Sequence, residues 1–221
     1  MDTLRKQMAE QPRTSEGGFW HKLRYPHQMW LDGIFMASPY LVQYGATFDE
    51  PALFDEATKQ ILLIKSKTYD PATGLYYHGW DESHEQKWSN PETGCSPNFW
   101  SRSIGWYGAA IVDVLDFLPQ ETAGRDSILQ ILQGLAKAIV KYQDPSSGTW
   151  YQVTDQGARE GNYLESSATA LFIYTLAKAI NKGYIGNEYI EPTQKAFDGM
   201  VKTFTRLEED GSYTITNCCA V

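Results

Sequence analysis

Residues 19–44, FWHKLRYPHQMWLDGIFMASPYLVQY, join a cluster of aromatic and basic side chains to the start of an otherwise apolar helix. The apolar positions that predict burial of this helix are Leu31, Ile34, Phe35, Leu41 and Val42. Asp32 stands in its first turn. A buried carboxylate is costly unless it is paired, hydrogen-bonded or protonated. Asp32 is therefore either a structural N-cap, a position that aspartate favours, or an acid tuned for catalysis.

A turn phrase recurs four times along the chain, in which a glycine follows a turn-forming segment and precedes an aromatic residue. The copies are TSEGGFWHKL, DPATGLYYHGW, DPSSGTWYQV and EEDGSYTIT. Successive glycines lie 56 to 74 residues apart, measured from Gly18 to Gly74, Gly148 and Gly211, and two helical stretches separate each pair. The chain is thus predicted to repeat a helical hairpin.

The two helices of each hairpin differ, because the first is apolar on most faces and the second is amphipathic. We expect inner helices over about residues 30–44, 100–118 and 163–180, and outer helices over about 51–66, 125–143 and 189–207. Polar and aromatic side chains cluster at the N-terminal ends of the inner helices. This favours an all-α toroid, whose inner helices open toward one cavity, over a plain helical bundle. Residues 1–221 are predicted to form one domain, a partial barrel of about six helices in three hairpins.

The composition indicates a folded, acidic chain. Its 221 residues are 42% hydrophobic, enough to bury a substantial core. The net charge of -8, with Lys and Arg scattered, argues against a nucleic-acid or anionic-membrane surface. Aromatic residues reach 14%, and many stand beside Gly, Asn, Asp or Ser, as in proteins that stack on sugar rings, although core packing could absorb most of them.

The cysteines and the length of the apolar segments indicate the cellular compartment in which the protein is expected to work. Cys95, Cys218 and Cys219 are odd in number and two are adjacent, which suits a reduced compartment better than a disulfide framework. The first residues hold no apolar signal segment, and no apolar run reaches membrane-spanning length. The chain is therefore expected to be cytoplasmic.

Four segments in order carry a resemblance to a known family: HKLRYPHQMWLDGIFM, YYHGWD, FWSRSIGWYGAAIVDVLDFLP and YLESSATALFIYTLAKA. Together they resemble the unsaturated rhamnogalacturonyl hydrolases of glycoside hydrolase family 105, to which the unsaturated glucuronyl hydrolases of family 88 are related. The resemblance covers essentially the whole chain. It implies an (α/α)6 barrel, of which these residues correspond to the middle.

The resemblance also implies a reaction unlike ordinary glycoside hydrolysis. The substrate carries a 4,5-unsaturated uronic acid at its non-reducing end, left there by a polysaccharide lyase. Protonation at C4 creates a cation at C5, water adds at C5, and the resulting hemiketal opens and releases the remaining sugar. One carboxyl group can serve as acid and then as base. The family pattern implies Asp32 for that role, with burial raising the pKa of such a carboxyl group.

Substrate-binding positions follow from the same pattern. The candidates are His21, Lys22, Trp30, His78, Trp100, Arg102 and Trp106. Arg102 begins an inner helix, where a guanidinium and free backbone N–H groups together suit a carboxylate. The family more often shows ARGNGW where this chain has SRSIGW, and its second aspartate, on an earlier inner helix, has no counterpart here.

Other carboxylates receive different predictions. The set His78, Asp81, His84 and Glu85 lacks a standard ligand spacing, so neither a metal nor a cofactor is expected. Asp113 and Asp116 lie toward the far end of their helix and are expected to be structural. Glu165 begins the third inner helix and is an outside candidate for a second carboxyl group in the cavity.

The leading prediction is an unsaturated rhamnogalacturonyl hydrolase acting on lyase-generated pectin oligosaccharides. Two alternatives stay open: an unsaturated glucuronyl hydrolase acting on glycosaminoglycan fragments, and an inactive carbohydrate-binding or assembly module. The predicted partner is an oligosaccharide, with no nucleic acid and no membrane. An open partial barrel exposes apolar edges, so copies of the chain are also expected to associate.

Overall fold

The computed structural model describes residues 1–220. It contains seven α-helices and one short 3-10 helix, η1 (Asn187–Tyr189). The α-helices are α1 (Asp2–Glu10), α2 (Leu31–Phe48), α3 (Ala52–Thr68), α4 (Ser101–Val114), α5 (Arg125–Lys141), α6 (Ser166–Asn181) and α7 (Ile190–Phe204). The strands form two antiparallel pairs, β1 (Gln28–Trp30) with β2 (Gly79–Asp81) and β3 (Thr205–Leu207) with β4 (Tyr213–Ile215).

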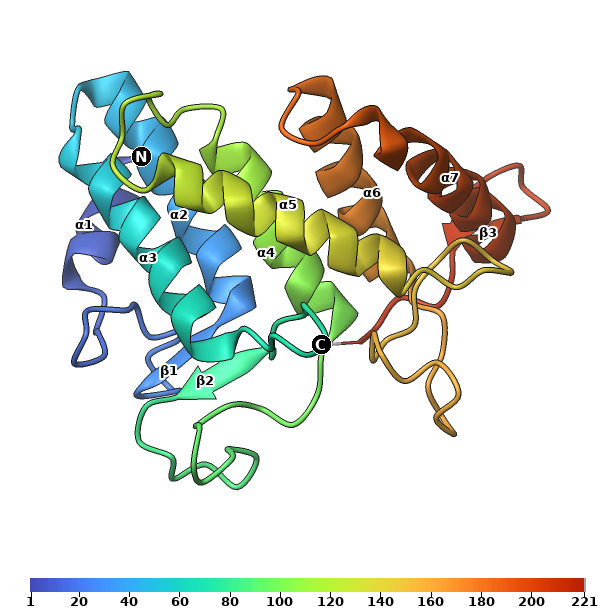
Figure 1. Ribbon diagram of the computed structural model, residues 1–221, viewed down its shortest axis with the longest axis horizontal. Helices are drawn as coiled ribbons and strands as arrows, with labels where there is room; N and C mark the ends of the chain where they lie inside the picture. The colour runs from blue at the N-terminus through green and yellow to red at the C-terminus, as the bar shows by residue number, and fades with distance from the viewer. Residues whose placement is uncertain (221) are drawn as a thin grey trace.

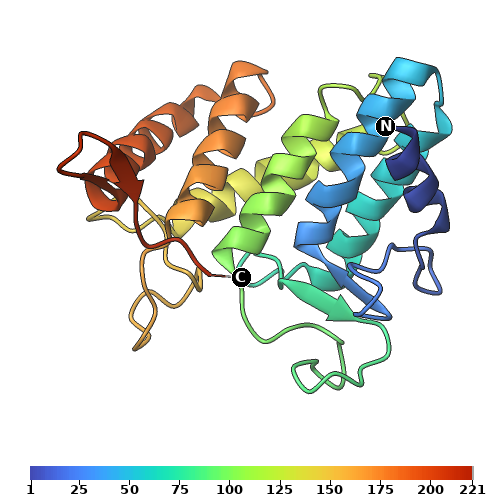
Figure 2. The ribbon, with the colours of Figure 1, turned by 180° about the vertical axis from the view of Figure 1, so that it is seen from behind.

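The helices form two layers, as the hairpin repeat predicts. Helices α2, α4 and α6 lie side by side and form the inner layer. Helices α3, α5 and α7 form the outer layer, which packs against one face of the inner layer (Figure 1). Figure 2, seen from behind, shows the three inner helices in blue, green and orange. The predicted all-α architecture of the (α/α)-barrel type is confirmed.

One helix was missing from the prediction of six. The additional helix, α1, fully buries none of its residues and carries mostly polar side chains, so Leu4 and Met8 are the only apolar pair at helical spacing by which the sequence could reveal it. Met8 packs against the core from the side, and polar contacts run from Tyr40 Oη to the Met1 carbonyl (2.8 Å) and from Arg5 Nε to Glu50 (3.0 Å). These bonds attach α1 to α2 and the start of α3.

Two glycines let inner helices α4 and α6 approach closely. A Cβ at Gly105 would lie 2.7 Å from Leu171 Cβ, and one at Gly108 would lie 2.9 Å from Thr175. Any larger residue at these positions would force the helices apart.

At the other end of α4 and α6, away from their N-terminal ends, Lys178 forms salt bridges of 2.6 Å with both Asp113 and Asp116. The two aspartates therefore have the structural role predicted for them, Asp113 from the last turn of α4 and Asp116 from the turn that follows it.

The turn phrases have a repeated structural role. Leu31 N donates to the His78 carbonyl (3.0 Å), Ser101 N to Gln152 (3.0 Å), and Ser166 N to Asn217 (3.1 Å). In each case the first N–H group of an inner helix is satisfied by the extended segment that follows the next turn phrase. Gly74, Gly148 and Gly211 all have a positive φ, which glycine adopts without a steric penalty.

None of the helices in the described residues is long and apolar enough to cross a membrane.

Candidate active site

The N-terminal ends of α2, α4 and α6 lie on one side of the molecule, together with the β1–β2 pair and the loops that follow the turn phrases (Figure 1). Seven of the eight predicted site residues lie in these helix ends or loops. The β1–β2 pair contributes directly, because Trp30 pairs with Gly79 and so lies beside His78. Segments separated by about 50 to 70 residues thus meet at the N-terminal ends of the inner helices, and we call this region the mouth.

Aromatic and imidazole rings form a continuous row across this mouth. Tyr25 stacks on Trp30, with ring centroids 5.0 Å apart. Trp30 meets the edge of His78 at 4.7 Å, and His78 stacks on Trp100 at 5.1 Å. His21 also stacks on Trp30, at 4.4 Å. Because these rings stack on one another, most of their faces are covered, and Trp100, 36% exposed, is the ring of the row most open to a ligand.

Asp32 lies in the first turn of α2 and is half-buried. It does not cap the helix, because α2 begins after Trp30 without a side-chain cap hydrogen bond. Its Oδ2 accepts a hydrogen bond of 2.6 Å from Ser103 Oγ on α4. Within residues 1–220, Oδ1 accepts no protein hydrogen bond. The N-cap alternative is therefore wrong, and one carboxylate oxygen is left for a ligand.

Two histidines share the electrostatic environment of Asp32. Burial lowers the pKa of His21 to about 4, and the Asp32 charge opposes that shift. Burial also lowers the pKa of His78, again against Asp32, and the Arg102 charge lowers it further. Both imidazoles are therefore neutral at pH 7, and each has one N–H donor and one acceptor nitrogen.

Positive charge comes from Arg102 and Lys22. Arg102, in the first turn of α4, donates from Nη1 to the Cys219 carbonyl at 2.8 Å. Lys22 is exposed, with its Nζ 5.9 Å from the centre of the Tyr25 ring. The eighth predicted residue, Trp106, lies one turn further along α4 and packs on Phe35 at 4.5 Å. It joins α4 to α2 beneath the mouth.

The other carboxylates near the mouth are already satisfied by the protein. Glu165 is fully buried and caps α6, accepting from Ser167 N (3.1 Å) and Ala168 N (2.6 Å). Asp81 is fully buried and accepts from Ser83 and Gln86. Neither carboxylate has a free oxygen directed at a ligand comparable with Asp32 Oδ1. Among residues 1–220, no cluster of three or more His, Cys, Asp or Glu side chains has metal-binding geometry.

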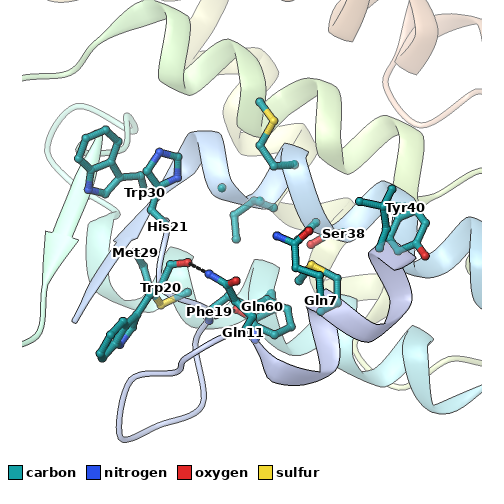
Figure 3. A pocket seen from close by; sticks show the side chains of 16 residues that line it. Gln7, Gln11, Phe19, Trp20, His21, Met29, Trp30, Ser38, Tyr40 and Gln60 are labelled. Carbon is teal, nitrogen blue, oxygen red and sulfur yellow. Dashed lines mark hydrogen bonds between the residues drawn. The ribbon is translucent and has the colours of Figure 1, made fainter. Parts of the chain in front are cut away.

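A cavity of about 260 Å³ adjoins the ring row on its α1 side (Figure 3). His21 and Trp30 line one end, and apolar side chains of α1 and α2 line most of the rest. Gln11 Nε2 donates to the Trp20 carbonyl at its edge, at 2.7 Å. Asp32 is not part of its lining, so the cavity lies next to the catalytic candidate rather than around it.

Three contributors to the mouth were not predicted from the sequence. Ser103 and Tyr25 lie within the motifs that carry the resemblance. The residue type alone does not predict that Ser103 contacts Asp32 or that Tyr25 contacts Trp30. Cys219 contributes its backbone carbonyl, for which a sequence holds no residue-specific signal. All three cysteines are free thiols, Cys95 buried and Cys218 exposed.

Comparisons with known proteins agree with the resemblance drawn from the motifs. The family model described as Glycosyl Hydrolase Family 88 matches residues 1–221. Protein Atu3128 of Agrobacterium fabrum is 35% identical over 185 residues, which are 82% of this chain and 78% of that protein. The unsaturated rhamnogalacturonyl hydrolase YesR of Bacillus subtilis is 28% identical over 205 residues, 90% of this chain and 54% of YesR.

A solved structure, described as a C. acetobutylicum glycoside hydrolase from family 105, superimposes with a TM-score of 0.96 at 41% identity. The alignment covers 99% of this chain and 61% of that one. The chain therefore spans little more than half the length of this structure and of YesR.

Proposed function

The chain belongs to glycosyl hydrolase family 88, with its likeness to solved structures supporting family 105 as well, and from this premise we propose that it is an unsaturated uronyl hydrolase. The reaction is hydration of the 4,5-double bond of an unsaturated uronic acid at the non-reducing end of an oligosaccharide. The observation that carries the proposal is the half-buried Asp32, held through one oxygen by Ser103 among rings suited to a sugar. Its other oxygen accepts no hydrogen bond within residues 1–220.

In this proposal Asp32 exchanges protons with the substrate. Its carboxyl group gives a proton to C4, and the resulting carboxylate takes a proton from the water that attacks C5. The hemiketal formed at C5 opens, and the remaining sugar leaves. One group acting as acid and then as base supplies roughly 10²–10⁴-fold of the rate.

The surrounding side chains bind the substrate. Arg102 supplies the charge that pairs with the uronate carboxylate, because a guanidinium matches a carboxylate in geometry and charge. His21 and His78 are neutral at pH 7 and therefore contribute hydrogen bonds rather than charge. Trp100, the most exposed ring of the row, offers an apolar surface to the sugar, and Trp30 supports the histidines that stack beside it.

For the substrate we propose lyase-generated rhamnogalacturonan (pectin) oligosaccharides. The name of YesR, a rhamnogalacturonyl hydrolase, supports this choice. Glycosaminoglycan fragments, the substrates of unsaturated glucuronyl hydrolases, are the alternative. Three free cysteines support the further proposal that the protein works in the reducing cytoplasm.

The test compares wild type with Asp32→Asn on an unsaturated rhamnogalacturonan disaccharide and on an unsaturated chondroitin disaccharide. The ultraviolet absorbance of the conjugated double bond reports its loss by hydration. We expect decay with wild type on the first substrate and at least about 100-fold slower decay with Asp32→Asn. Faster decay on the chondroitin disaccharide would move the assignment to the glucuronyl hydrolases. No decay on either substrate, with binding retained, would establish a binding module.

A further inference from the structure

Glu165 holds more than the helix it caps. Its carboxylate is fully buried, and among residues 1–220 no cation forms a salt bridge with it. Ser167 N donates to its Oε1 and Ala168 N to its Oε2, and Oε1 also accepts a hydrogen bond of 2.8 Å from the backbone N–H of Cys219. One buried carboxylate thus joins the start of α6 to a segment more than 50 residues away in the sequence.

Cys219 in turn contacts Arg102. Its backbone N–H is held by Glu165, and its carbonyl accepts from Arg102 Nη1 at 2.8 Å. Its thiol accepts a hydrogen bond from Gln152 Nε2 at 3.1 Å. The route from Glu165 to the guanidinium therefore passes through a single residue's backbone.

The segment that includes Cys219 occupies a regular place in the repeat. Asn217 accepts from the first N–H of α6 as His78 does for α2 and Gln152 does for α4. This segment is therefore held at two points: Asn217 is bonded to the start of α6, and Cys219 is bonded to Arg102. This arrangement is specific enough to fix the direction of a guanidinium.

We propose that Glu165 is a positioning residue, which acts through the Cys219 backbone to hold the Arg102 guanidinium where a substrate carboxylate binds. The role of Arg102 in this statement rests on the proposed function, whereas the attachment of Cys219 to Glu165 does not. An arginine held in this way loses less side-chain freedom on binding, which strengthens its contribution to affinity.

The first experiment measures the attachment without any substrate. In a Cys218→Ser background, Cys219 is the one thiol outside the core, since Cys95 is buried. We compare the rate at which a disulfide reagent labels Cys219 with and without Glu165→Gln. An amide nitrogen in place of one carboxylate oxygen cannot accept the N–H donors that both oxygens now accept, so we expect labelling to be about tenfold faster.

The matched control is Asp81→Asn, the same change of chemistry at another fully buried carboxylate satisfied by N–H and hydroxyl donors. It should leave labelling of Cys219 unchanged. Equal labelling of the Glu165→Gln and parent proteins would overturn the attachment. Equal acceleration by Asp81→Asn would overturn it also, because general loosening of the fold would then explain the result.

The second experiment measures the consequence for the substrate. Glu165→Gln should raise KM for the unsaturated disaccharide about tenfold while kcat changes less than about threefold. The same variant in an Arg102→Lys background should raise KM little further, because the residue through which it acts has been replaced. Additive effects would overturn the route through Arg102.

Cys219→Pro tests the same route if Glu165→Gln proves too unstable. Proline removes the N–H donated to Glu165 and leaves the α6 cap bonds from Ser167 and Ala168 in place. It should raise KM more than Cys219→Ala, which keeps both backbone groups. Equal KM values for these two variants would overturn the proposal. Absence of turnover in the wild type overturns the proposed function instead, and the labelling result still decides the attachment.

Discussion

Ser103 on α4 donates a hydrogen bond of 2.6 Å to Oδ2 of Asp32 on α2, joining the N-terminal ends of two neighbouring inner helices. Ser103 is buried, so water competes little for this bond. The bond leaves Oδ1 as the oxygen that accepts no hydrogen bond from residues 1–220. The orientation of the proposed acid therefore depends on packing between α2 and α4 as well as on α2 itself.

Replacing Ser103 by alanine should lower kcat while KM changes little. A hydrogen bond to a charged group contributes about 1.5–3 kcal/mol, which corresponds to a fall of roughly 10- to 100-fold if it acts only in the transition state. Ser38→Ala is the control, since this buried hydroxyl on α2, the helix of Asp32, has no partner among the described residues. Steady-state kinetics on the unsaturated disaccharide measures both. An unchanged kcat for Ser103→Ala would show that Asp32 needs no such support.

Arg102→Lys should raise KM for substrates that carry the uronate carboxylate. Lysine keeps the charge but loses the planar fork that binds both carboxylate oxygens. We expect a rise in KM of about tenfold or more, with a smaller change in kcat. The comparison is with Lys22→Ala, which removes an exposed charge at the edge of the ring row. A larger effect of Lys22→Ala would assign the carboxylate to that lysine.

The sequence predicts features that depend on neighbouring residues and does not predict contacts between residues far apart in the chain. Apolar periodicity and turn phrases are local, and they placed the starts of α2, α4 and α6 within three residues of the observed ones. Helix α1 offers only Leu4 and Met8 at that spacing, and the prediction of six helices does not include it. The Asp32–Ser103 and Arg102–Cys219 contacts join positions 71 and 117 residues apart. No local pattern encodes such pairs, because they exist only once the helices have packed.

The histidine at position 21 should make stability depend on pH in a defined range. Its pKa is about 4 in the folded protein, below the value of 6.5 for an unperturbed histidine. Between these values the unfolded chain binds more protons, so stability is full above about pH 6.5 and is lost as the pH falls toward 4. Denaturant unfolding at several pH values should show a weaker decline for His21→Gln than for wild type. Parallel curves would mean that His21 titrates normally in the folded state.

Lys178 should contribute to stability without affecting catalysis. It forms salt bridges with Asp113 and Asp116, and these contacts, with burial opposing them, raise the pKa of Lys178 above its usual value. Lys178→Met should lower the free energy of unfolding by about 1 kcal/mol, which corresponds to roughly 2–4 °C in Tm. Calorimetry at low and high salt checks this, since screening should shrink the difference. A fall in kcat would place this ion cluster in the site after all.

Exposed apolar side chains mark the two edges of the helical array, and we propose that copies of the chain associate there. Met36 on α2 is 59% exposed at one edge, and Phe197 on α7 is 52% exposed at the other. On α7, Ile190 and Val201 are also about half exposed at helical spacing from Phe197, and contiguous exposed apolar patches are typical of interfaces. Light scattering should therefore give a mass above that of one chain, and Phe197→Glu should reduce it. Leu23→Glu is the control, because Leu23 is 72% exposed but lies in a loop beside α1 rather than on α7. A single-chain mass across all concentrations would exclude self-association through these edges.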